Sequence, residues 1–337
     1  GIFLGWDVTL ISTILSKSDN AASILISKGL LDLIFNSMQS TKTIIQEQSP
    51  YSEIIIDYWI HAITLLEKIV ISYNSDIFLI KSILDYCIQF LSIDFELNIS
   101  SGFVNKIIDC ISACTQKICD IDTFDIQYFV PFLMSLLDSK DTRYRIGILN
   151  LFNTISSPPI CFQWDLSVIL KISEYFLQWY SEKDSIHVDN NTRQKSICIF
   201  FELLSNVIQN QPEIFDSLSE YTFNGNPFFE VIYSMFENES HKFKVRIVHL
   251  FLALAIPQIW QKSVFFFLSK SIITNLFLYI ESEVNDEFRE EIIKTLIQIC
   301  SVNFMSSSPE IQSELIKEIQ SDIVSDVLES LENEDNG

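Results

Sequence analysis

Apolar positions recur along this chain with the 3.6-residue period of amphipathic α-helices, and no stretch shows the strict alternation of a half-buried strand. The period is clearest in residues 129–152, FVPFLMSLLDSKDTRYRIGILNLF. These return without a gap as residues 228–251, FFEVIYSMFENESHKFKVRIVHLF, at an offset of 99 (228 − 129). In both copies an apolar helix ends in an acidic turn and a second, amphipathic helix follows. The pattern predicts an all-α fold of repeated helical pairs, because one such pair cannot bury its apolar face alone.

The first helix of each predicted pair is a nearly continuous apolar rod. The rods span residues 29–38, 82–91, 129–137, 167–179, 228–236, 272–280 and 323–331. A short turn rich in Asp and Glu follows these rods, as in residues 138–142 and 237–241. Acidic residues suit such a turn, because the dipole of the next helix favours negative charge at its N-terminus.

The second helix of each predicted pair carries a polar stripe opposite its apolar one. In residues 142–156 that stripe contains Arg143, Gly147, Asn150 and Thr154, spaced i, i+4, i+7 and i+11. The same spacing starts again at positions 57, 105, 195, 242 and 287. The equivalent stripes contain Asp57, His61, Thr64 and Lys68; Asn105, Asp109, Ser112 and Gln116; Lys242, Arg246, His249 and Ala253; and Glu287, Glu291, Lys294 and Gln298. The stripe that starts at 195 fits less well, because apolar Ile199 interrupts Lys195, Glu202 and Asn206. The intervals between starts are close to the roughly 40–47 residues of HEAT and armadillo units.

The segment FVPFLMSLLDSKDTRYRIGILNLFNTIS resembles the second and third helices of an armadillo repeat, and the rest of the chain resembles degenerate copies of it. A HEAT-type repeat is a close alternative. The resemblance implies one right-handed α-solenoid over residues 1–337, whose third helices line a concave groove that binds extended peptides. The groove residues would include Arg143, Asn150, Lys195, Asn206, Lys242, Arg246 and His249. Neither end carries a clear polar capping repeat, so we expect the chain to be a piece of a longer solenoid.

The nuclear-import adaptor branch of the armadillo family places a Trp four residues before an Asn on successive third helices. Here the residue four before Asn153 is Leu149, the residue four before Asn206 is Glu202, and Trp59 is followed four residues later by Ile63. The paired ladder is absent, which disfavours the binding of classical basic signals.

The charge balance is strongly acidic, with 44 Asp and Glu against 22 Lys and Arg and a net charge of −22. A general nucleic-acid binder or a polybasic membrane-surface protein needs the opposite sign, so we expect neither class. The longest uncharged run, residues 146–164, contains two Asn and two adjacent Pro, and it is not expected to span a membrane. Seven cysteines without a CxxC pair fit reduced thiols in a cytoplasmic or nuclear protein.

Candidate chemistry is sparse. Cys110, Cys114 and Cys119 form the tightest cysteine cluster, which we interpret as core packing rather than as a metal site, because no fourth ligand is near. His61 and His249 occupy equivalent stripe positions in units that are not neighbours, so we interpret both as groove residues. No phosphate loop, nucleophile elbow or dinucleotide fingerprint is present. The sequence predicts no enzyme, no cofactor and no metal.

Basic doublets recur near the start of three predicted second helices: Arg143 and Arg145, Arg193 and Lys195, and Lys242 and Lys244. Positive charge in a first helical turn opposes the helix dipole at a cost of about 0.3–1 kcal/mol. Two interpretations stay open. The doublets pair with the acidic turns upstream, which contain Asp138, Asp141, Glu237 and Glu239, or they form a basic strip that binds an acidic or phosphorylated protein segment.

We therefore expect a non-enzymatic protein-binding scaffold or adaptor. The alternatives are a nuclear transport receptor or adaptor of the same superfamily, and a regulatory subunit of a kinase or phosphatase complex.

Overall fold

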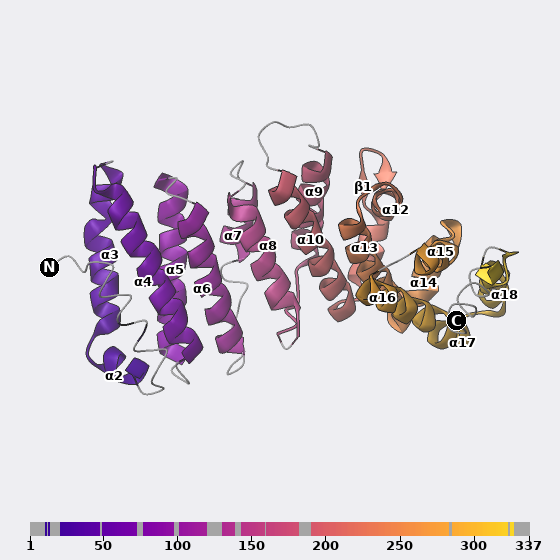
Figure 1. Ribbon diagram of the computed structural model, residues 1–337, viewed down its shortest axis with the longest axis horizontal. Helices are drawn as coiled ribbons and strands as arrows, with labels where there is room; N and C mark the ends of the chain where they lie inside the picture. The colour runs from indigo at the N-terminus through magenta and orange to yellow at the C-terminus, as the bar shows by residue number, and fades with distance from the viewer. Residues whose placement is uncertain are drawn as a thin grey trace. The chain divides into compact units, whose positions relative to one another are not determined.

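The computed structural model is helical throughout the part of the chain that it describes, apart from one short β-hairpin (Figure 1). The described residues are 11, 13, 21–47, 49–72, 77–97, 101–119, 130–138, 143–158, 160–181, 190–282, 285–322 and 324–326. They fall into two compact units, a first unit within residues 1–160 and a second unit within residues 161–337. The all-α class predicted from the periodicity is confirmed.

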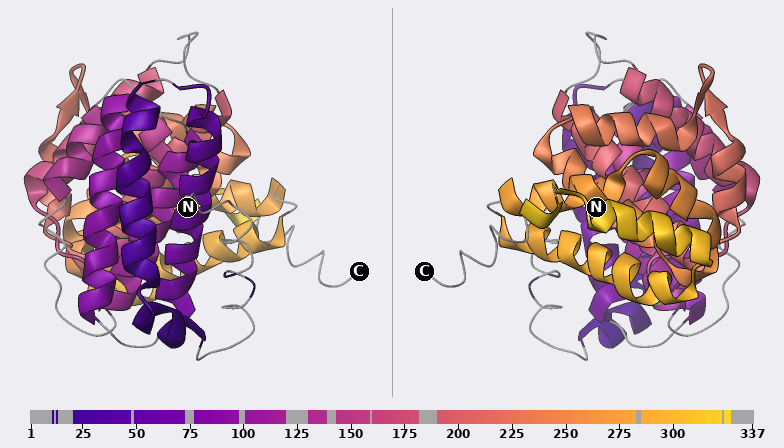
Figure 2. Two further views of the ribbon diagram at one scale, coloured as in Figure 1. Left: turned by 90° about the vertical axis from the view of Figure 1, so that its left-hand side faces the viewer. Right: turned by 90° about the vertical axis from the view of Figure 1, so that its right-hand side faces the viewer.

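In the first unit the predicted second helices stack on one another, α4 on α6 and α6 on α8. The unit contains α2 (Ala21–Ser27), α3 (Leu30–Gln46), α4 (Ser52–Ser72), α5 (Ile77–Leu97), α6 (Ser101–Cys119), α7 (Val130–Asp138) and α8 (Arg143–Ser156). Each apolar rod packs on the second helix of its own pair, α3 on α4, α5 on α6 and α7 on α8. The left view of Figure 2 shows α3 to α6 running alongside one another. Repeated helical pairs lead to this packing, because each buries its apolar face on the next.

Trp59 joins four helices in the core of the first unit. Its side chain on α4 is fully buried, and its ring centroid lies 5.5 Å from those of Phe90 on α5 and Phe103 on α6. The indole N–H donates a hydrogen bond of 2.9 Å to the Thr41 hydroxyl on α3. An aromatic residue buried in this way needs a partner for its N–H, and Thr41 supplies it.

The polar face predicted for residues 142–156 needs one correction. Gly147 is buried, and a Cβ atom at this position would lie 2.5 Å from Cδ1 of Ile108 on α6. The glycine therefore allows α8 to approach α6 closely and does not belong to an open face. Asn150 is exposed and Thr154 half-buried, and the predicted apolar stripe is fully buried: Ile148, Leu149, Phe152 and Ile155.

In the second unit the same stacking runs from α10 to α13 and from α13 to α16. Its helices are α9 (Leu166–Ser181), α10 (Asn190–Asn210), α11 (Ile214–Glu220), α12 (Phe228–Asn238), α13 (His241–Leu254), α14 (Pro257–Ser269), α15 (Ile272–Ser282), α16 (Asp286–Ile297), a π-helix (Gln298–Asn303), α17 (Phe304–Ser306) and α18 (Pro309–Ile319). Helix α18 was not predicted, although the sequence Ser308-Pro309 is a typical helix start. In the structure the Ser308 hydroxyl accepts a hydrogen bond from the backbone N–H of Ile311. The right view of Figure 2 looks along this unit from its C-terminal helices.

The hairpin joins α11 to α12 through strands β1 (Thr222–Phe223) and β2 (Asn226–Pro227). Asn224 and Gly225 form its turn with φ values of 51° and 82°, which the hairpin turn of the Asn-Gly type requires. Strands of two residues are too short to show in the apolar period, but the Asn-Gly pair signals the turn.

A buried glutamine ties the end of α10 to the segment before α9. The Gln211 side chain accepts a hydrogen bond of 2.6 Å from the backbone N–H of Trp164 and donates one of 3.1 Å to its carbonyl oxygen. Both residues are buried. The amide thus supplies both partners that the backbone of Trp164 needs.

Among the described residues no single helix has the length and apolarity needed to cross a membrane. Helices α14 and α15 have the necessary length and apolarity only when taken together, and a bend of 72° separates them. The predicted rod at 323–331 lies largely outside the described residues, as does the turn at 139–142.

Candidate functional site

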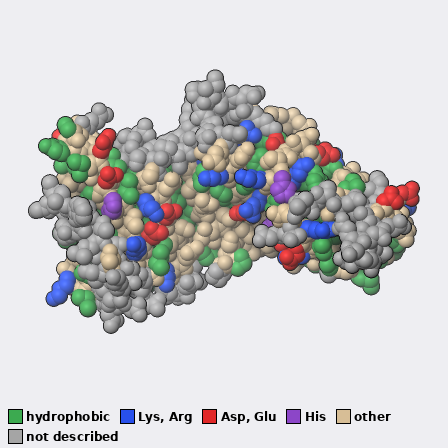
Figure 3. Space-filling model, viewed as in Figure 1, with side chains coloured by type: hydrophobic (Ala, Val, Ile, Leu, Met, Phe, Trp, Pro, Cys, Tyr) green, Lys and Arg blue, Asp and Glu red, His purple; other side chains and the backbone are tan. Residues whose placement is uncertain are grey.

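Exposed basic side chains of the second unit gather on neighbouring helices α10 and α13. Lys195 on α10 and Lys242 on α13 are both exposed. Figure 3 shows basic side chains together on the face formed over these two helices. Burial raises the pKa of the Cys198 thiol, one turn after Lys195 on α10; the charges of Arg246 and Lys242 on α13 oppose that effect, and the charge of Glu202 adds to it. Lys195, Lys242 and Arg246 are called the basic patch below.

The acidic turn before α13 does not neutralise this patch. No described carboxylate lies within ion-pair distance of Lys195 or Lys242. Glu239 accepts a hydrogen bond of 2.8 Å from the Tyr180 hydroxyl, and the backbone oxygen of Glu237 accepts one of 3.4 Å from Lys244. Of the two interpretations left open by the sequence, pairing with the upstream turn is therefore not seen for Lys242.

Arg246 is the one member of the basic patch that has a carboxylate partner. Its Nη1 lies 2.6 Å from Oε1 of Glu202 on α10, and both side chains are about one-third exposed. This ion pair connects α13 to α10 in addition to the apolar packing between them. A guanidinium has five N–H donors, so one contact through Nη1 leaves others for a ligand.

His249 lies two turns after Lys242 on α13 and is half-buried. Burial lowers its pKa, and the charge of Glu291 on α16 opposes this shift only in part. The imidazole is therefore neutral at pH 7 and adds no charge to the basic patch. Oε1 of Glu291 lies 2.9 Å from Nζ of Lys294, so the charges of these two side chains cancel each other.

The second members of the doublets are placed differently from Lys195 and Lys242. Arg145 is buried, with 7% of its surface exposed, and Arg193 is half-buried. Lys244 donates a hydrogen bond to the Tyr279 hydroxyl and lies 4.9 Å from the centroid of its ring. The two members of a doublet thus have different surroundings, as their two-residue spacing on a helix requires.

The predicted site residues are brought together only in part. Lys242, Arg246 and His249 lie on α13, and Lys195 lies on α10, which packs against α13; Asn206 is half-buried further along α10. Asn150 is exposed on α8 of the first unit, and the side chain of Arg143 lies outside the described residues. Because α10 begins at Asn190, Lys195 lies in its second turn and not in the first turn as predicted.

The stripe predicted from position 105 lines a cavity in the first unit. Asp109, Ser112 and Gln116 on α6 face Glu67 and Ile71 on α4 across a space of about 380 Å³. Burial raises the pKa of Glu67, against the opposing charge of Lys106, whose Nζ lies 3.8 Å from its carboxylate. The carboxylates on this face of α4 and α6 are therefore paired with Lys106, whereas Lys195 on α10 and Lys242 on α13 have no described carboxylate partner.

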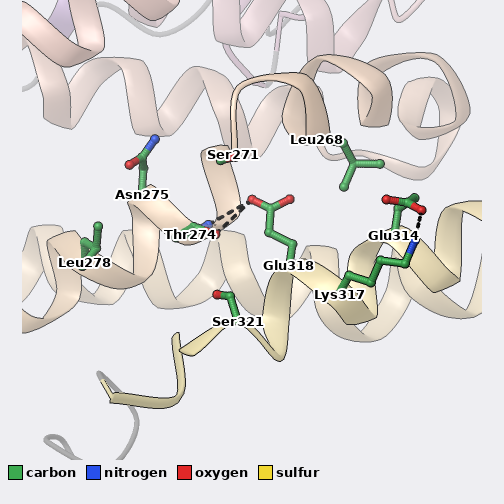
Figure 4. Close-up of a pocket in the computed structure, with 9 residues that line it drawn as sticks. All are labelled: Leu268, Ser271, Thr274, Asn275, Leu278, Glu314, Lys317, Glu318 and Ser321. Carbon is green, nitrogen blue, oxygen red and sulfur yellow. Dashed lines mark hydrogen bonds and ion pairs between the residues drawn. The ribbon is translucent and has the colours of Figure 1, made fainter. Parts of the chain in front are cut away.

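A cavity of about 560 Å³ lies between α14, α15 and α18 in the second unit. Figure 4 shows Glu318 pointing across it to Thr274. The carboxylate accepts hydrogen bonds from the backbone N–H and the hydroxyl of Thr274, at 3.2 Å and 3.3 Å. Glu318 therefore caps the first turn of α15, and burial raises its pKa. We interpret this carboxylate as structural.

The cysteine cluster differs in membership from the predicted one. Cys110 and Cys114 on α6 are buried beside Cys87 on α5, which the spacing does not reveal, while the side chain of Cys119 is outside the described residues. Hydrogen bonds from Cys114 and Cys87 lower the pKa of Cys110. Within the described ranges no group of three or more His, Cys, Asp or Glu side chains has a geometry that holds a metal ion.

Comparison with family models, with curated proteins and with solved structures gives no match to this chain. The basic patch and the helical packing around it are therefore the observations from which a function is proposed.

Proposed function

We propose that this chain is a non-enzymatic protein-binding scaffold of the armadillo or HEAT type. In this proposal the polar faces of the second helices form a groove that binds an extended segment of a partner protein. The observation that carries it is the pair of exposed lysines on α10 and α13, Lys195 and Lys242, which have no described carboxylate partner. Their helices stack directly on each other.

Acidic residues outnumber basic ones by 44 to 22 in this chain, yet no described carboxylate pairs with Lys195 or Lys242. Lys242 also lies in the first turn of α13, where its charge opposes the helix dipole. Among the described residues no carboxylate pairs with Lys242 to offset this cost. A binding role accounts for both, because an acidic partner supplies the missing negative charge and is steered by the patch.

Reversing both charges, Lys195→Glu with Lys242→Glu, should weaken partner binding by at least about tenfold. Both side chains are exposed, so the melting temperature should stay within about 2 °C of the parent. The measurement is affinity capture from the native cell with quantitative mass spectrometry, followed by titration of the recovered partner against each variant.

The matched control is Lys171→Glu with Lys317→Glu, which changes the net charge equally at two exposed lysines on α9 and α18. The control should retain the partner. Equal binding by the parent and the Lys195/Lys242 variant would overturn the proposal. The identity of the recovered protein separates a general scaffold from the two alternatives, since transport factors or a kinase or phosphatase catalytic subunit would be recovered in those cases.

A further inference from the structure

We propose that the basic patch recognises a phosphorylated serine or threonine in the partner segment, and not merely a run of acidic residues. This inference rests on the proposed function and names the ligand of the same site. It follows from the charge of the patch, from its free donors and from the charge of the rest of the chain.

The charge of the patch matches that of a phosphoryl group. Lys195, Lys242 and Arg246 carry three positive charges, and Glu202 removes one through its ion pair with Arg246. Cys198 and His249 are neutral at pH 7, because burial raises the pKa of the thiol and lowers that of the imidazole. Lys195, Lys242, Arg246 and Glu202 together thus leave two positive charges. A phosphorylated side chain carries about −1.5 to −2 at pH 7, whereas one carboxylate carries only −1.

The donors of the patch come from two helices and suit an acceptor with several oxygens. The Nζ atoms of Lys195 and Lys242 have no described ion-pair partner, and Arg246 uses Nη1 for Glu202. The remaining N–H groups are available for charge-assisted hydrogen bonds, which are about twice as strong as neutral ones. A phosphoryl group offers three acceptor oxygens at one point, while a carboxylate offers two.

The acidic remainder of the chain argues for a small anionic ligand. A net charge of −22 repels an extended polyanion such as a nucleic acid or an anionic membrane, which approaches much of the protein surface at once. A single phosphoryl group on an otherwise neutral or basic segment meets only the local field of the patch. We therefore commit to a phosphorylated protein segment as the occupant.

The test uses three peptides of sequence acetyl-Gly-Gly-X-Gly-Gly-amide, with X as phosphoserine, glutamate or serine. Each is titrated against the full chain labelled with ¹⁵N, and shifts are followed by NMR at low salt. The phosphoserine peptide should bind at least about tenfold more tightly than the glutamate peptide, and the serine peptide should cause no shifts. Binding should be lost in Lys195→Met with Lys242→Met and kept in Lys171→Met with Lys317→Met.

Two further experiments, phosphatase treatment and vesicle sedimentation, test the inference separately from the proposed function. Phosphatase treatment should release the partner captured from the native cell. Equal binding of the phosphoserine and glutamate peptides would overturn the inference, while capture that still depends on Lys195 and Lys242 would leave the scaffold function standing. Sedimentation with phosphatidylcholine vesicles that contain phosphatidylinositol phosphate should not occur, and patch-dependent sedimentation would also overturn it.

Discussion

Replacing Trp59 by alanine is expected to lower the free energy of unfolding by about 3–5 kcal/mol, which is the usual cost of truncating a fully buried tryptophan. The indole packs on Phe90 and Phe103 and bonds to Thr41, so its loss opens a cavity where α3, α4, α5 and α6 meet. Urea denaturation followed by far-ultraviolet circular dichroism measures the total effect. Hydrogen exchange read by mass spectrometry should show faster exchange in α3 to α6.

Trp59→Phe and Thr41→Val separate the packing from the hydrogen bond. Phenylalanine fills most of the space, and the Thr41 hydroxyl keeps its 2.9 Å bond to the Ser37 carbonyl, so we expect a loss of about 1–2 kcal/mol. Thr41→Val leaves the buried indole N–H without its acceptor and should cost about 1–3 kcal/mol. A Trp59→Ala variant as stable as the parent would contradict the packing described for the first unit.

Replacing Gln211 by leucine should cost about 2–5 kcal/mol in the second unit. The change removes both side-chain partners of the Trp164 backbone, and each buried polar group left without a partner costs about 1–3 kcal/mol. The same denaturation experiment measures the loss, and the Trp164 amide proton should exchange faster by NMR.

Gln209→Leu is the matched control, because Gln209 lies two residues before Gln211, in the last turn of α10, and is exposed. It should change stability by less than about 0.5 kcal/mol. Gln211→Glu keeps the acceptor but sets a carboxylate oxygen against the Trp164 carbonyl. We expect it to be unstable at pH 7 and to recover as the pH falls, since a protonated carboxyl group donates again. Equal stability of Gln211→Leu and Gln209→Leu would contradict the buried bonding of Gln211.

The sequence predicts the helical pairs well because burial alone generates their period. The second helix predicted over 142–156 is α8, and the apolar residues predicted for its core are fully buried. The second helices predicted from positions 195 and 242 are α10 and α13, and these two helices pack on each other. Such features depend on local spacing and on the repeat, and both are readable along the chain.

Features that depend on contacts between distant residues were not predictable in this way. Gly147 was assigned to the polar face from its spacing along the helix, yet its small size is what allows α8 to approach Ile108. Cys87 joins Cys110 across two helices, and Gln211 bonds to a residue 47 positions earlier. A single sequence does not encode these contacts in its periodicity.

The burial of Cys87, Cys110 and Cys114 turns ordinary cysteine labelling into a probe of how often α5 and α6 separate. A soluble disulfide reagent reaches these sulfurs only when the helices part, whereas Cys161 in the second unit is already partly accessible. Partly accessible cysteines such as Cys161 should therefore react quickly, and the three buried cysteines of the first unit should react slowly. The rate of the slow reaction reports the free energy of transient opening in the first unit alone, without denaturant and without any engineered label.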